Sequence, residues 1–117
     1  MSMSAKQIFY KVKKHLLKQG ERSVGGDEDS YLYRSDDGVM SCAVGCLMTN
    51  DMYSPHFEGF GVAELEYDVM TPIVGVHKSS REYKLGLLEA LQGVHDYCTP
   101  YNWASALDLV QDRYNIT

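Results

Sequence analysis

The chain has 117 residues, of which 44% are hydrophobic and 23% are charged, and its formal net charge is −5. This composition is typical of a globular protein and argues against general disorder. The length predicts a single domain over residues 1–117, and the negative charge argues against a dedicated nucleic-acid binder. The charge is uneven, because residues 1–20 contain five lysines and no acidic residue, so that this segment alone carries +5.

The N-terminal segment lacks the pattern of a secretory signal, because lysines interrupt its apolar stretches. No apolar run approaches the ~20 residues that span a bilayer. An odd number of cysteines, three, is typical of reduced thiols in a chain without a signal. We therefore expect a soluble, cytoplasmic protein, in its own cell or in an infected host cell, with no membrane partner.

The first predicted element is an amphipathic helix over residues 4–19. Ser4 is a good N-cap, apolar residues recur after it at helical spacing, and Gly20 is a natural C-terminal stop. Most of the lysines fall outside the apolar stripe. Lys11 and Lys14 are accordingly candidate residues for binding a partner or the phosphate of a ligand.

Residues 31–42 predict an antiparallel β-hairpin. Tyr31, Tyr33 and Arg34 lie in an aromatic-rich strand pattern, a strong turn signal follows at Asp37-Gly38, and the strand then returns. These three residues join the two lysines as candidate binding residues, because tyrosine is favoured at interfaces.

The middle of the chain gives weaker signals. The apolar residues 42–49 predict a short helix. Residues 69–76 are rich in β-branched side chains but are interrupted by Pro72 and Gly75, which predicts an extended or loop segment.

Two further helices are predicted over residues 80–97 and 101–114, where apolar residues again follow helical spacing. Ser79 and Glu82 fit a capping box at the start of the first helix. Both helices should pack against the helix over residues 4–19. The predicted fold is therefore α+β, with about four helices packed on a small antiparallel β-hairpin. The expected core comprises Leu32, Val44, Leu47, Leu87, Leu91, Val94, Trp103 and Leu107.

Cys42 and His95 are the candidate catalytic pair. Cys42 lies where the strand is expected to meet a helix N-terminus, a position that lowers a thiol pKa, and His95 would act as the base. Asp96 is poorly placed to orient His95, since adjacent helix positions point about 100° apart.

A metal site is the second chemical interpretation. Cys42, Cys46, His95 and Cys98 are the residue types that a tetrahedral zinc site requires. Their spacing is atypical, however, and the first pair lies in an apolar run. Cysteines that pack as small buried side chains are therefore the favoured interpretation, and we expect no metal or other cofactor.

Several of these stretches combine into a recognisable pattern. They are Leu32-Tyr33-Arg34, Asp37-Gly38, the run Cys42-Ala43-Val44-Gly45-Cys46-Leu47, and His95-Asp96 followed by Pro100 and Trp103. Together they resemble a family of small proteins from bacteria and their phages. The resemblance implies a bacterial or phage origin and assigns no catalytic residue.

The sequence leaves three functions open. The leading one is an accessory protein that binds a partner protein, such as a component of a host's machinery. The second is a small enzyme that uses Cys42 and His95, with or without a metal. The third is a protein that sequesters a small ligand or nucleotide. The oligomeric state stays open, a homodimer included.

Overall fold

The computed structural model describes residues 2–24, 32–35 and 38–117, so that Tyr31 and Asp37 of the predicted turn lie outside the described part. Within it the α-helices are α1 (Ala5–Gln19), α2 (Tyr67–Val74), α3 (Lys78–Tyr97) and α4 (Trp103–Arg113). Short 3-10 helices lie between them: η1 (Gly45–Leu47), η2 (Pro55–Phe57), η3 (Val62–Glu64) and η4 (Pro100–Asn102).

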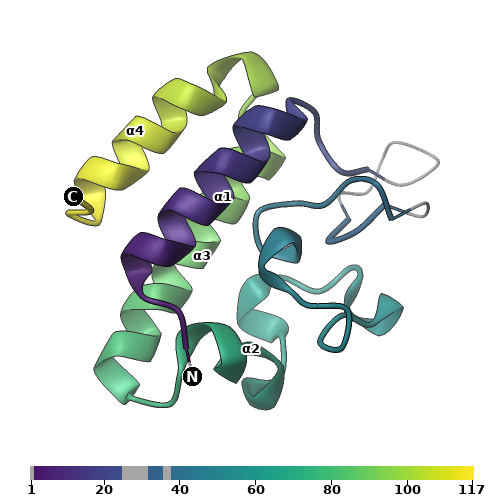
Figure 1. Cartoon of the computed structure of the whole chain (residues 1–117), viewed down its shortest axis with the longest axis vertical. Coiled ribbons are helices and arrows are strands. Elements are labelled where there is room, and N and C mark those ends of the chain that lie inside the picture. The colour runs from purple at the N-terminus through teal and green to yellow at the C-terminus, as the bar shows by residue number, and fades with distance from the viewer. Residues whose placement is uncertain (1, 25–31, 36–37) are drawn as a thin grey trace.

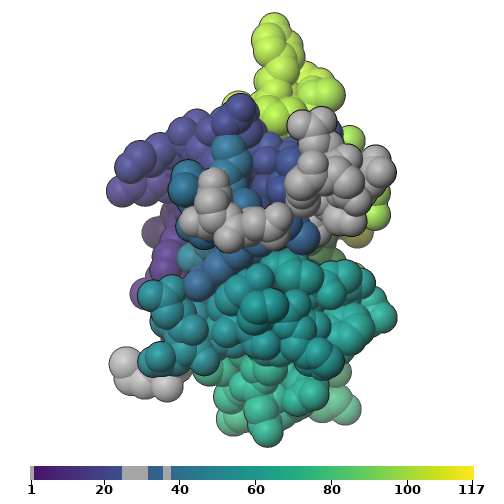
Figure 2. Space-filling view, turned by 90° about the vertical axis from the view of Figure 1, so that its right-hand side faces the viewer, coloured from purple at the N-terminus to yellow at the C-terminus, as the bar shows by residue number. Residues whose placement is uncertain are grey.

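The helices α1, α3 and α4 lie side by side and pack on one another (Figure 1), as their apolar stripes predict. The segment between α1 and α3 covers one side of this three-helix unit, and Figure 2 looks at that side. Trp103, at the start of α4, is fully buried. Of the expected core, Leu32 is only half-buried. The other seven residues are buried: Val44, Leu47, Leu87, Leu91, Val94, Trp103 and Leu107.

The ends of α1 follow their local signals. Ser4 forms a capping box with Gln7, and Gly20 ends the helix with a φ of 69°. The predicted capping box of α3 is wrong, because α3 begins at Lys78 with His77 as its N-cap and no side-chain cap.

Of the helices in the described residues, none combines the length and the apolar character needed to cross a bilayer.

The α+β prediction is wrong: the protein is all-helical, and its described residues contain no sheet. The predicted hairpin is reduced to one isolated bridge between Arg34 and Ser41. Two backbone hydrogen bonds flank this bridge, from the Cys42 N–H to the Tyr33 C=O at 3.2 Å and from the Ser35 N–H to the Met40 C=O at 2.9 Å. The pairing stops there because the Cys42 C=O accepts from the Cys46 N–H at 3.0 Å as the chain turns into η1.

Side chains bind the neighbouring backbone groups. The amide N–H groups of Tyr33 and Arg34 donate to the Glu58 carboxylate at 2.8 and 3.2 Å. The Gln19 amide pairs with both the N–H and the C=O of Ser41, at 3.0 and 2.9 Å.

The extended segment predicted over residues 69–76 is also wrong, because α2 occupies most of it. Arg81 of α3 explains the difference. Its guanidinium, which is largely buried, donates to the carbonyls of Tyr67 and Gly75 and to the Thr71 hydroxyl. It also lies 3.7 Å from the centre of the Tyr67 ring. These contacts stabilise a short helix that contains a proline.

Candidate functional site

Two side chains of α3, Gln92 and Asp96, lie between His95 and the stretch that follows Cys42. The Gln92 amide oxygen accepts from the backbone N–H of Val44 at 3.1 Å, and its nitrogen donates to Asp96 Oδ1 at 3.0 Å. A hydrogen bond from the Gln92 side chain lowers the pKa of Cys42, although burial outweighs it. His95 Nδ1 lies 2.7 Å from Asp96 Oδ1. Gln92 and Asp96 therefore form a polar network that links His95 to the backbone at Val44, two residues after Cys42.

His95 is fully buried in this network. Its Nε2 accepts from the backbone N–H of Ser23 at 2.9 Å. Because that N–H can only donate, Nδ1 carries the proton and donates to Asp96. The ring also stacks on Trp103, with centroids 5.7 Å apart and planes at 26°. Both nitrogens are thus engaged inside the protein.

The expectation that Asp96 is poorly placed to orient His95 is wrong. The 100° offset describes the Cα–Cβ directions, whereas the side-chain dihedrals decide where the carboxylate ends. Asp96 reaches the ring beside it and accepts from Gln92 with the same oxygen.

The thiols lie in surroundings that favour their protonated form. Cys42 is fully buried, its sulfur accepts from the Gly45 N–H at 3.4 Å, and burial raises its pKa to about 12. Cys46 donates to the Ala43 carbonyl at 3.1 Å, and burial likewise raises its pKa to about 12. A nucleophilic cysteine must react as a thiolate. The geometry therefore favours a structural role, and catalysis by Cys42 stays a prediction.

A metal site finds no support in the arrangement. Across residues 2–24, 32–35 and 38–117, no group of three or more His, Cys, Asp or Glu side chains is placed to hold a metal ion. Cys42, Cys46 and Cys98 are free thiols.

Sequence reasoning missed two residues that hold this network in place. Arg22 donates to the carbonyls of His95 and Cys98, at 3.1 and 2.6 Å, and so caps the C-terminal end of α3. Ser23 supplies the N–H that His95 accepts, while its own hydroxyl is buried with no hydrogen-bond partner in the described structure. Both residues lie in a polar stretch without a local motif, so no sequence signal distinguishes them.

The predicted binding residues of the hairpin are used inside the fold. Tyr33 is buried and its hydroxyl donates to the Phe60 carbonyl at 2.5 Å. The Arg34 guanidinium donates to Asn50 Oδ1 and to the Met48 carbonyl, at 2.9 and 2.8 Å. Tyr31 lies outside the described residues.

Lys11 and Lys14, in contrast, lie exposed on α1. Lys18, which the sequence analysis did not select, is also exposed and continues the same line at spacings of three and four residues. We call these three residues the basic face. No ion pair with another described residue neutralises any of them.

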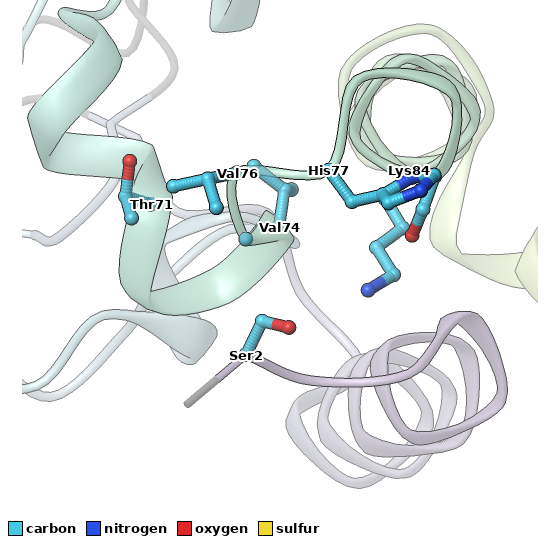
Figure 3. Close-up of a pocket in the computed structure, with 8 residues that line it drawn as sticks. Ser2, Thr71, Val74, Val76, His77 and Lys84 are labelled. Carbon is cyan, nitrogen blue, oxygen red and sulfur yellow. The ribbon is translucent and has the colours of Figure 1, made fainter.

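Two hollows of the surface border these elements. One of about 400 Å³ lies beside the last turn of α1 and is lined by His15, Lys18, Gln19, Val39 and Met40. Another, of about 330 Å³, lies between the N-terminal stretch, the end of α2 and the start of α3. Figure 3 shows Ser2 and Lys84 pointing into the second hollow. Next to this hollow, the Met3 N–H donates to the Ile73 carbonyl at 2.9 Å. The hollow therefore lies where the N-terminal stretch packs against α2.

The most exposed aromatic side chains of the described residues lie at the turn between α3 and α4. Tyr97 and Tyr101 expose 85% and 94% of their surface. Figure 2 shows the segment near residue 100 projecting beyond the body of the protein.

No protein-family model matches the chain, and neither a curated protein nor a solved structure matches it.

Proposed function

We propose that this protein binds a partner protein through the basic face of α1, and that the partner presents an acidic surface. The observation that carries the proposal is the set of exposed lysines that form no ion pair with any described residue. Lys11, Lys14 and Lys18 are spaced so that like charges face one another on the helix, an arrangement that destabilises an isolated helix. A partner's carboxylates would relieve this repulsion.

The fold does not need these lysines for its own packing. The opposite face of α1 buries Ile8, Phe9, Val12 and Leu16 against the core. A rigid helix that presents charge lowers the entropic cost of binding, because its backbone is already ordered. We place this activity in the cytoplasm of a bacterium or of its phage-infected host, where the free thiols stay reduced.

The test compares two triple variants that change the net charge equally. The face variant reverses Lys11, Lys14 and Lys18 to Glu. The control variant reverses three exposed cations elsewhere, Lys6→Glu, Lys78→Glu and Arg113→Glu. Each tagged protein is incubated with bacterial lysate, and bound proteins are quantified by mass spectrometry at low and at high ionic strength, after circular dichroism has shown equal folding.

We expect an acidic protein that the wild type and the control retain, that the face variant loses, and that high salt releases. Equal capture by the two variants, or no specific capture by the wild type, would overturn the proposal. Loss of capture on addition of ATP would instead support the sequestering of a nucleotide.

A further inference from the structure

The end of α1 and the stretch before η1 form a fixed wall. The Gln19 amide pairs with the backbone N–H and C=O of Ser41, at 3.0 and 2.9 Å. His15 Nε2 lies 2.8 Å from the same carbonyl and 3.1 Å from the Ser41 hydroxyl. Two side chains of α1 therefore hold the extended stretch in place, and the neighbouring Val39 and Met40 are positioned by the same contacts.

The hollow that this wall borders combines an apolar and a cationic side. Its volume of about 400 Å³ falls within the range of ligand-binding clefts. Val39, which exposes 77% of its surface, and Met40 supply apolar atoms, and Lys18 supplies a positive charge. Among the described residues that line it, none is acidic.

The basic face leads directly to this hollow, because Lys18 belongs to both. A partner segment that pairs its carboxylates with Lys11 and Lys14 can therefore place a neighbouring side chain between Lys18 and Val39. An apolar side chain matches the Val39 and Met40 surface, and burial there removes both surfaces from water.

We infer that the hollow beside Lys18 receives one large apolar side chain from an acidic segment of the partner protein. The inference rests on the proposed function, since it specifies what the basic face binds. The lysines supply attraction and orientation, and the apolar anchor supplies selectivity among acidic proteins.

Two fluorescein-labelled synthetic peptides test the inference with the whole protein. One has the sequence Asp-Glu-Glu-Phe-Glu-Asp-Glu, and its matched control has Ala in place of Phe. Both are titrated by fluorescence anisotropy at low ionic strength. We expect the Phe peptide to bind about tenfold more tightly, the ratio that partial burial of one aromatic side chain supplies.

Two variants separate the apolar contribution from the charge. Val39→Ser changes an exposed side chain and should bring the affinities for the two peptides within about threefold of each other, since it removes apolar area from the hollow. Lys18→Glu should weaken both peptides by similar factors.

Chemical shifts of the Val39 and Met40 methyl groups should move with the Phe peptide and stay unchanged with the Ala peptide. Equal affinities of the wild type for both peptides would overturn the anchor, while loss of that binding in Lys18→Glu would leave the proposed function standing. If neither peptide binds, the anchor inference fails, and the lysate capture decides the proposed function independently.

Discussion

Gly45 occupies the point where η1 meets the stretch around Tyr33, and its replacement is the sharpest test of this fold. A Cβ atom on Gly45 would lie 1.9 Å from the Tyr33 carbonyl oxygen and 2.7 Å from its carbonyl carbon. Non-bonded heavy atoms pack at about 3.5–4.0 Å, so the two backbones would have to separate by roughly 1.5 Å. Gly45 is therefore required by a close backbone approach.

Tyr33 cannot move away without loss. Its N–H donates to Glu58 at 2.8 Å, its carbonyl accepts from the Cys42 N–H at 3.2 Å, and its hydroxyl donates to Phe60 at 2.5 Å. Overpacking a core costs about 1–3 kcal/mol, and a lost hydrogen bond about 1 kcal/mol more. We expect Gly45→Ala to lower the free energy of unfolding by about 3 kcal/mol or more, a large part of the ~5–15 kcal/mol of a typical domain.

Gly93→Ala is the matched control, because a Cβ there meets only a Tyr97 ring carbon at 3.9 Å. This residue lies inside α3, where alanine is preferred over glycine by about 0.5–1 kcal/mol, so the control should be stabilised. Urea titration followed by Trp103 fluorescence, which reports on a fully buried ring, measures both variants. A Gly45→Ala protein within about 0.5 kcal/mol of the wild type, with an unchanged m-value, would refute the close approach.

Two further predictions concern buried groups, namely the thiols of Cys42 and Cys46 and the hydroxyl of Ser23. Cys42 and Cys46 have a pKa raised from 9.0 to about 12 by burial, so iodoacetamide at pH 8 should modify them only after unfolding. Because the unfolded chain releases these protons first, stability should fall as the pH rises from 9 toward 12. An alkaline urea midpoint equal to that at pH 7, or fast labelling of Cys42 in the native protein, would contradict this. Ser23→Ala removes a buried hydroxyl that has no hydrogen-bond partner among the described residues, and it should raise the free energy of unfolding by about 1 kcal/mol. A loss of stability in thermal unfolding would contradict this and indicate a further contact of that hydroxyl.

The helices that the sequence predicts correctly are those whose signals are local. In α1 the cap at Ser4, the apolar spacing and the stop at Gly20 all lie within one continuous stretch. The apolar spacing of α3 and α4 is equally local. Periodicity and caps act over a few residues, so they can be read without knowledge of the fold.

The elements that the sequence predicts wrongly depend on distant partners. Tyr33 and Arg34 have a strand's composition, but Glu58, more than twenty residues away, takes their N–H groups. The segment with Pro72 has a poor helix propensity, but Arg81 of the next helix binds its carbonyls. Tertiary contacts of this kind override local propensity.

In the candidate site, too, the sequence identifies individual residues but not the distant contacts that surround them. The chemistry-bearing residue types at Cys42 and His95 are visible in the sequence, and in the structure Gln92 and Asp96 link His95 to the backbone two residues after Cys42. The burial of Cys42 and His95 depends on tertiary packing. The hydrogen bond from the Ser23 N–H to His95 joins two residues that lie 72 positions apart in the sequence. Sequence spacing therefore identifies the members of the network and leaves their role open.

The side chains of this network already form hydrogen bonds inside the protein, and this bears on which groups can bind another molecule. A polar group that is already hydrogen-bonded inside the protein gains little by binding a ligand, because each new bond replaces an existing one. His95, Asp96 and Gln92 are all in this condition. The lysines of the basic face are in the opposite condition, since they are exposed and no described residue pairs with them. Exposed charges without a described partner, among them the lysines of the basic face, are therefore the groups that gain most from binding another molecule. The net charge of −5 conceals this local positive charge, because residues 21–117 carry −10.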